Sequence, residues 1–177
     1  MKKTLLIITI LAISFIATGS NYANASEIAV VNLQKIMQES SASKSARSQL
    51  KAKKQEFQKQ ISKLEASLQK QDKELAQQKA VLSKDEFSKK LVTFRKKAAN
   101  AQKDVQAKRA KLNKAFEESL SKIQKSIISI VSKLSKEKGF KIAVSSSQAI
   151  YVSNELDISN EVLKRLNKEL PKLNVKF

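Results

Sequence analysis

Residues 82–94 read LSKDEFSKKLVTF, and this stretch decides how the chain folds. Ser83, with Glu86 three residues later, has the capping-box pattern that begins a helix, in which each residue bonds the backbone of the other. The pattern predicts that one helix ends near Leu82 and that the next begins near Lys84. A turn at this point would reverse the chain, so the two helices would lie side by side.

The sequence on both sides of the turn is suited to long helices. Residues 26–138 contain neither Gly nor Pro, the residues that most strongly interrupt a helix, and are rich in Lys, Gln, Ala, Leu, Glu and Ser. The second helix is expected to end at Gly139, which follows the basic residues Lys136 and Lys138. At about 1.5 Å per residue the helices would be roughly 65 and 80 Å long, so residues 39–138 are predicted to form a helical hairpin, an arm rather than a compact domain.

Apolar residues along the first helix repeat at coiled-coil spacing. Two rows, each with a period of seven, interleave in steps of three and four: Leu50, Phe57 and Leu64, and Ile61, Leu68, Leu75 and Leu82. This heptad pattern predicts a seam that packs against the second helix. Polar residues occupy core positions of the seam at Lys54, Gln71 and Gln78, so we expect the arm to bend easily.

The second helix continues the seam with one irregularity. Its apolar residues from 87 to 105 follow steps of four and three, whereas Leu112, Phe116 and Leu120 are separated by four and four. The pattern therefore predicts Phe116 in the seam. It also predicts that supercoiling relaxes there, because the extra residue shifts the register.

Short apolar segments at the two ends of the mature chain predict a small base from which the arm extends. Residues 28–32, 140–144 and 149–152 have the character of strands. A final helix is expected to open at residues 157–160 and to end before Pro171.

The predicted base, residues 26–38 and 139–177, is too small to bury a stable core alone, so we expect it to oligomerise through its sheet edges. The residues expected at this interface are Ile28, Val30, Ile142, Val144, Ile150 and Val152. The predicted fold is thus mainly α with a small β body: a long antiparallel helical hairpin, with its turn near residues 83–85, inserted in a strand-and-helix base.

Residues 1–25 have the order of a secretory signal peptide. Lys2 and Lys3 form a basic start, residues 4–18 are almost all apolar, and a small-residue motif ends at Ala25. A membrane anchor is the alternative, but a spanning helix needs about 20 apolar residues. The sequence therefore predicts cleavage after Ala25 and a mature protein that works outside the cytoplasm with a net charge of +17.

The residue types that the chain lacks exclude many kinds of chemistry. It has no Cys, His or Trp, so thiol catalysis, an imidazole base, a zinc finger and haem ligation are excluded. Its two Gly leave no room for a Gly-rich phosphate-binding loop. We therefore expect no enzymatic activity, no metal and no cofactor. A structural coiled-coil spacer remains an alternative, although it would need unbroken heptads without a turn.

The ends of the mature chain carry a resemblance to a known family. Residues 28–36, IAVVNLQKI, and residues 150–151, IY, followed by LDISNEVLKRLN at 156–167, resemble the Skp (OmpH) family of periplasmic chaperones, as does the order of the elements. The resemblance implies a periplasmic homotrimer whose three bases form a β-barrel-like body. It also implies that the arms enclose a cavity for unfolded outer-membrane proteins without using ATP. One departure is Asn32, where Asp is common in the family.

The arm carries nearly all of the net charge. Residues 39–138 hold 26 basic and 11 acidic residues, a net charge of +15. A cavity walled by three such arms would attract acidic clients and keep the arms apart. Together with the resemblance, this charge predicts a holdase that prevents the aggregation of unfolded outer-membrane proteins. Client contacts are expected near the arm tip, at Lys84, Phe87, Lys89, Lys90, Arg95, Lys96 and Lys97. For each single Lys the alternative is an ordinary solvated charge, and for Phe87 it is packing in the seam.

A second basic cluster lies further along the second helix. Its residues are Lys103, Lys108, Arg109, Lys111 and Lys114. The family has been associated with lipopolysaccharide, whose phosphates suit Lys and Arg side chains, and an anionic membrane surface would offer similar groups. Non-specific binding of a polyanion, lipopolysaccharide or nucleic acid, is therefore an alternative function. The signal peptide argues against nucleic acid as a physiological partner.

Overall fold

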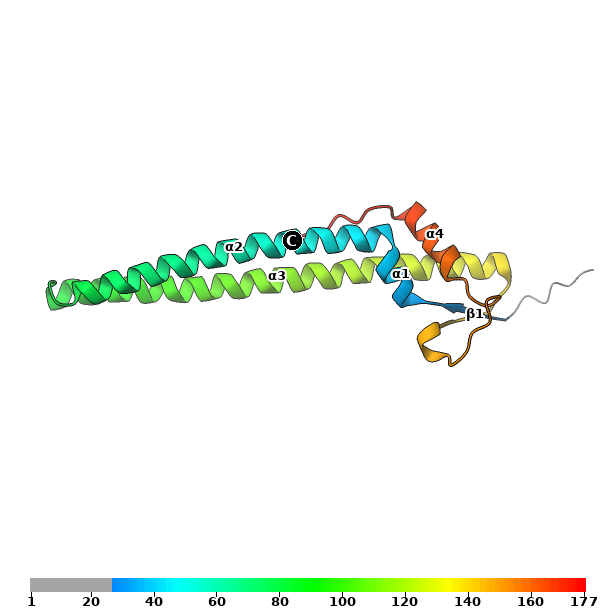
Figure 1. Cartoon of the computed structure of the whole chain (residues 1–177), viewed down its shortest axis with the longest axis horizontal. Helices are drawn as coiled ribbons and strands as arrows, with labels where there is room; N and C mark the ends of the chain where they lie inside the picture. Colours follow the sequence, from blue (N-terminus) through cyan, green and yellow to red (C-terminus); the bar gives the residue numbers. More distant parts are fainter. Residues whose placement is uncertain (1–26) are drawn as a thin grey trace, which may run out of the picture.

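A computed structural model describes residues 27–177, and the predicted signal peptide with its cleavage site lies outside the described residues. Two long helices form an arm, and the remaining elements gather at one end of it, as Figure 1 shows. The elements follow one another in the order β1, α1, α2, α3, β2, a short 3-10 turn and α4. The predicted fold, a helical hairpin inserted in a small base of strands and helices, is confirmed.

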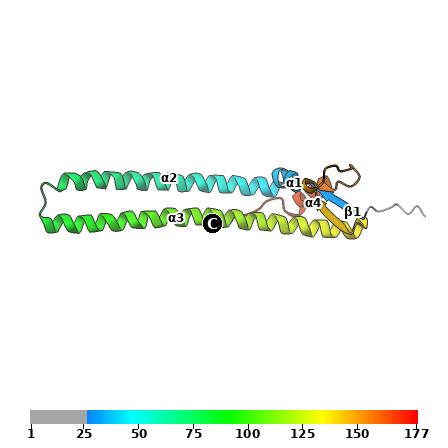
Figure 2. The same cartoon turned by 90° about the horizontal axis from the view of Figure 1, so that it is seen from below.

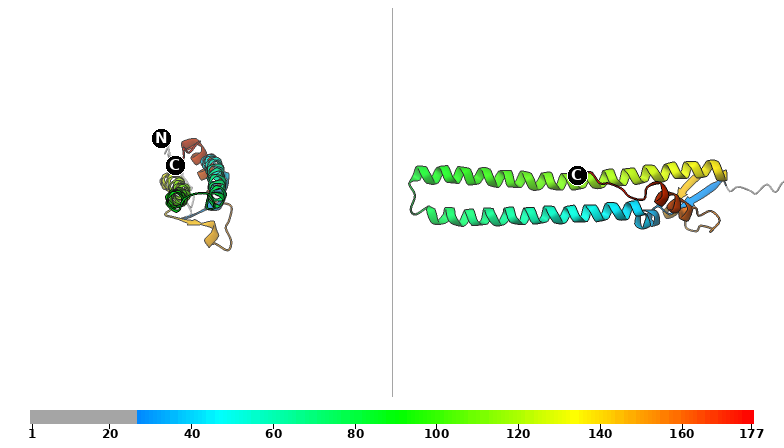
Figure 3. Two further views of the ribbon diagram at one scale, coloured as in Figure 1. Left: turned by 90° about the vertical axis from the view of Figure 1, so that its left-hand side faces the viewer. Right: turned by 90° about the horizontal axis from the view of Figure 1, so that it is seen from above.

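The arm consists of α2 (Ser41–Gln78) and α3 (Lys84–Lys138). The two helices run antiparallel and lie side by side, as the views in Figures 2 and 3 show. A short helix, α1 (Leu33–Glu39), precedes α2, and Ser40 separates the two. The arm therefore leaves the base directly from packed helices and not from a flexible linker.

The turn at the arm tip forms as the capping box predicts. Ser83 Oγ accepts a hydrogen bond from the backbone N–H of Glu86 at 3.3 Å, and Glu86 Oε2 accepts one from the backbone N–H of Ser83 at 3.3 Å. α2 ends at Gln78, slightly before the expected Leu82, and residues 79–83 make the turn. At its other end α3 is closed by Gly139 in the left-handed conformation, with φ of 82°.

Close packing of the seam is confined to the part of the arm nearest the base. Toward the tip, the last buried residue of α2 is Phe57 and the last buried residue of α3 is Ala101. Beyond them the seam residues are only half-buried, and Lys54, which the heptads place in the core, is exposed. The outer arm is therefore held by a thin seam.

The expected position of Phe116 in the seam is wrong. Its side chain is 50% exposed, whereas Ala115 and Ser119 are buried. Ser119 Oγ donates a hydrogen bond to Ala115 O at 2.6 Å, which satisfies the buried hydroxyl. The residues buried at this level of the arm are small: Ala115 and Ser119 of α3 and Ala46 of α2.

The base contains a two-stranded parallel sheet. β1 (Ile28–Val31) pairs with β2 (Ile142–Ser145), so that Ile28 lies opposite Ile142 and Val31 opposite Ser145. The whole arm is therefore the connection between two neighbouring strands.

Asn32, the departure from the family pattern, caps the first helix. Its Oδ1 accepts a hydrogen bond from the backbone N–H of Lys35 at 2.8 Å, and α1 begins at the next residue. Asn and Asp cap helices about equally well, so the start of α1 does not depend on the lost charge.

The last helix, α4 (Ser159–Glu169), covers the base as predicted. It contributes to a core of aliphatic side chains that are almost entirely buried: Ile36, Ile123, Ile130, Leu134, Val162 and Leu166. These residues come from α1, α3 and α4. The base end of α3 is thus part of the base core.

Residues 149–152 do not form the expected third strand, and a short 3-10 turn, η1 (Ser146–Gln148), precedes them. The second edge of β1 is occupied instead by the segment that leads into α4. Val30 N–H donates to Leu156 O at 2.8 Å, and Ile158 N–H donates to Val30 O at 3.0 Å. Residues 149–152 pair with no strand in the described chain, and Ile150 is fully exposed.

Candidate functional site

Large apolar side chains lie exposed on the base. They belong to β1, α1, α3, β2 and the segment after η1: Ile28, Leu33, Ile128, Ile142, Ile150 and Tyr151. A hollow of about 270 Å³ lies beside them, lined by residues of α3 and β2 that include Ile128 and Val144. Exposed apolar surface of this kind typically marks a site of contact with another protein.

The residues predicted at an oligomer interface differ in their accessibility. Ile28, Ile142 and Ile150 are exposed, and Val144 and Val152 are half-buried. Val30 is only 4% exposed, and its backbone N–H and C=O are both hydrogen-bonded within the chain, to Leu156 and Ile158. Val30 therefore belongs to the core of the protomer in this arrangement.

The predicted client-binding residues surround the arm tip. Phe87 is half-buried at a seam position, as the alternative of seam packing requires. The six basic side chains are exposed: Lys84, Lys89, Lys90, Arg95, Lys96 and Lys97. Within residues 27–177 none of these six forms an ion pair. Their charges are therefore not neutralised by acidic neighbours in direct contact.

Two of these lysines also join the helices of the arm. Lys90 Nζ donates to Gln78 Oε1 at 2.8 Å, and Lys97 Nζ donates to Gln71 Oε1 at 3.0 Å. Gln71 and Gln78, two of the three polar residues that interrupt the heptads, are thus hydrogen-bonded across the hairpin. Around them lies an open groove of about 380 Å³, whose lining combines the apolar Leu75 and Phe94 with ammonium and amide groups.

The second basic cluster is not brought together as one site. Lys103, Arg109 and Lys111 are exposed, but Lys108 is mostly buried, with its side chain 15% exposed. Lys108 pairs with Asp104 at 2.5 Å and lies over the ring of Phe57, 5.7 Å from its centroid. Lys114 lies 3.9 Å from Glu118. At least one member of the cluster is therefore engaged in the structure of the arm itself.

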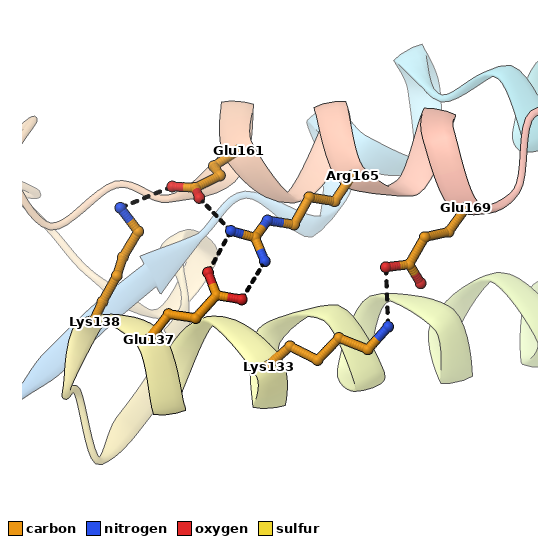
Figure 4. A network of polar contacts seen from close by, with 6 residues as sticks. All are labelled: Lys133, Glu137, Lys138, Glu161, Arg165 and Glu169. Carbon is orange, nitrogen blue, oxygen red and sulfur yellow. Dashed lines mark hydrogen bonds and ion pairs between the residues drawn. The ribbon is translucent and has the colours of Figure 1, made fainter.

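An ionic network that the sequence did not reveal holds α4 against the base end of α3, as Figure 4 shows. Arg165 donates two hydrogen bonds to Glu137, at 2.7 and 2.5 Å, and a third to Glu161 at 2.8 Å. Lys138 pairs with Glu161 at 2.8 Å. The hydrogen bonds from Arg165 lower the pKa of Glu137, and the bond from Lys138, with that from Arg165, lowers the pKa of Glu161.

The described residues offer neither a metal site nor a membrane span. No cluster of acidic side chains in residues 27–177 could hold a metal ion. In the same range, no helix is both long and apolar enough to cross a membrane.

Comparison with known families gives a match over nearly the whole of this architecture. The family of OmpH-like outer membrane proteins matches the chain over residues 27–166, from β1 into α4. The chain belongs to the OmpH-like family. The matched range contains the complete arm and most of the base.

A solved structure has the same OmpH-like fold. The crystal structure of a protein from Caulobacter crescentus CB15, assigned as an OmpH-like outer membrane chaperone, superposes with a TM-score of 0.78. The superposition covers 85% of this chain and 89% of that chain at 15% sequence identity, so it demonstrates a shared fold. A sequence comparison with curated proteins found no match.

Proposed function

We propose that this protein is a periplasmic holdase chaperone that acts without ATP, as a homotrimer, on unfolded outer-membrane proteins. The observation that carries the proposal is the presence of two different surfaces in one OmpH-like chain. An arm with unpaired basic side chains extends from a base whose exposed apolar side chains need a partner. The base would assemble the oligomer, and the arms would enclose the client.

The sheet of the base supports assembly. β2 has only β1 as a neighbour, and residues 149–152, which have strand character, have no strand neighbour in the described chain. Unpaired edges of this kind readily pair with another copy. We propose that residues 149–152 of one protomer extend the β2 edge of the next, which would bury Ile142, Ile150 and Tyr151.

Client capture would combine charge with many weak contacts. The arm carries a net charge of +15, and its apolar residues are largely used in the seam. Such a field raises the rate at which acidic chains are captured, and each single contact remains weak and quickly reversible. Strands of outer-membrane barrels alternate apolar and polar residues, so they could meet both the ammonium groups and the apolar lining of the tip groove.

The test is aggregation of an unfolded outer-membrane β-barrel protein on dilution from urea, at low and high salt. Reversal of Lys89, Lys90, Lys96 and Lys97 to Glu should weaken protection at low salt, because the attraction is electrostatic. The matched control reverses Lys122, Lys136, Lys164 and Lys168, which are exposed, unpaired and nearer the base. Equal protection by wild type and the tip variant at low salt would show that charge at these positions does not capture clients.

Binding of a polyanion is the second candidate function. The exposed residues Lys103, Arg109 and Lys111 favour it, since phosphate groups suit such side chains. Titration with lipopolysaccharide and with DNA of equal charge, at two salt concentrations, separates a lipid-specific site from general polyanion binding. Equal affinity for both, lost together at high salt, would indicate a general effect of charge.

A further inference from the structure

The C-terminal residues 171–177 lie beyond the range that the family match covers, and they pack against the rest of the protein. After α4 the chain turns back and runs toward the middle of the arm, as Figure 1 shows. Leu173 is 5% exposed and belongs to the core of the base, and Val175 packs against the same core. This segment, called the strap below, therefore joins the core of the base to the arm.

The strap is fastened to α2 by one side chain that bonds it twice. Gln49 Nε2 donates to Leu173 O at 2.6 Å, and Gln49 Oε1 accepts from the backbone N–H of Val175 at 3.1 Å. Ser45 Oγ adds a bond to Leu173 O at 3.3 Å. The amide of Gln49 thus pairs with the strap as a neighbouring strand would, with one donor and one acceptor.

The end of the strap reaches the last buried residue of α2. Lys53 Nζ lies over two rings, 5.1 Å from the centroid of Phe57 and 5.7 Å from that of Phe177. Beyond Phe57 no residue of α2 is buried, and between residues 84 and 100 none of α3 is. The strap therefore ends at the last buried residue of α2, while on α3 Ala101 is buried farther toward the tip.

We propose that residues 171–177 are a strap that makes the first part of α2, residues 41–57, one rigid unit with the base and so sets the point at which the arm bends. With the strap in place, bending begins beyond Phe57. Without it, the bend moves toward Ser40, where α1 and α2 meet, and the whole arm swings more widely. The reach of the arms, and with it the space between them, would then depend on seven residues at the end of the chain.

Hydrogen exchange of the full-length mature protein tests the fastening. Gln49→Ala removes both bonds of the amide, and Gln55→Ala is the matched control, since Gln55 is exposed on the same helix and contacts no strap residue. Exchange of amides 45–57 should become roughly tenfold faster in Gln49→Ala than in Gln55→Ala, with β1 and the tip unchanged. An equal effect of both variants, or faster exchange in β1 as well, would overturn the proposal.

The position of the bend is measured in a second experiment. The chain has no Cys, so a spin label can be placed at Ser62→Cys on the arm and at Asn154→Cys on the base, in protein diluted with unlabelled chains. Truncation after Leu170 should broaden the distance distribution between the two labels. A distribution unchanged by truncation would show that the strap does not set the bend. Neither measurement includes a client, so a failure of the holdase function leaves both results interpretable.

Discussion

The two ends of α3 differ in composition and in surroundings. At the base end Ile123, Ile130 and Leu134 are buried against α1 and α4, whereas residues 84–100 include no buried side chain. Residues 123–134 include four Ile and two Lys, whereas residues 84–100 include five Lys and no Ile. Neither end contains Gly or Pro, so the sequence permits a helix along both, while packing stabilises mainly the base end.

This contrast separates two roles within one helix. The base end is held by aliphatic packing and by the ionic network around Arg165. The tip is held by a capping box, a thin seam and the hydrogen bonds from Lys90 and Lys97 to glutamines. Stability is therefore concentrated where the protein is expected to assemble, and exposure where it is expected to meet clients.

The largest expected effect is the difference in hydrogen exchange between the two ends of α3. Amides of residues 123–134 should exchange about a hundredfold or more slowly than those of residues 84–100, because the first open only with the base core and the second by local unfolding. Mass spectrometry of peptides from both segments measures the ratio. Equal protection along α3 would refute the picture of a mobile outer arm.

A pair of leucine truncations tests the same contrast by stability. Leu166→Ala opens a cavity in the buried core and should cost about 2–5 kcal/mol, whereas Leu68→Ala, at a half-buried position of the outer seam, should cost less than about 2 kcal/mol. Urea unfolding at one fixed protein concentration compares the two, since assembly adds to apparent stability. A larger cost at Leu68 would mean that the arm, not the base, is the stable unit.

Charges introduced into β2 should affect assembly more than stability. Ile142→Asp with Val144→Asp should raise the dissociation constant of the oligomer by at least roughly tenfold, because buried interface positions tolerate charge poorly. Val92→Asp is the control, an exposed apolar residue on the arm. Sedimentation or native mass measurement decides between them, and a wild-type protein that is monomeric at micromolar concentration would refute the proposed trimer outright.

The smallest expected effect is a dependence on pH from the network at α4. The pKa values of Glu137 and Glu161 are lowered in the folded state, so both carboxylates stabilise the fold above their usual pKa of 4.5. That contribution is lost as the pH falls through the lowered values. Glu137→Gln should therefore reduce the melting temperature slightly at pH 7, and this reduction should shrink as the pH falls below 4.5. An effect that grows in acid would have the wrong sign.

Local signals in the sequence predicted local structure well. The capping box at Ser83, the stop at Gly139 and the apolar face of α4 each depend on residues a few positions apart, and each forms as expected. Gln71 and Gln78 were interpreted correctly as interruptions of the heptads. Their bonds to Lys97 and Lys90 could not be anticipated, because those lysines are 26 and 12 residues away.

The errors concern interactions between distant parts of the chain. Residues 149–152 have strand character but find the edge of β1 occupied by residues 156–158. Phe116 fits the spacing of a seam, yet Ala115 and Ser119 are buried at this level and the side chain of Phe116 is 50% exposed. The strap depends on Gln49, more than a hundred residues away in sequence, so no local pattern could predict it. The predicted client, lipopolysaccharide and oligomer sites remain predictions.

The parallel pairing of β1 with β2 has a consequence for the order in which the molecule assembles. Ile28 must meet Ile142 across the entire arm, which is a costly loop to close. Contacts across the arm shorten this loop in steps, since Gln78 meets Lys90 only 12 residues away and Gln71 meets Lys97 26 residues away. A hairpin that zips from Ser83 downward would bring the two strands together at its end. The turn that lies farthest from the base, and is weakest once the protein has folded, would then control how fast the base can form.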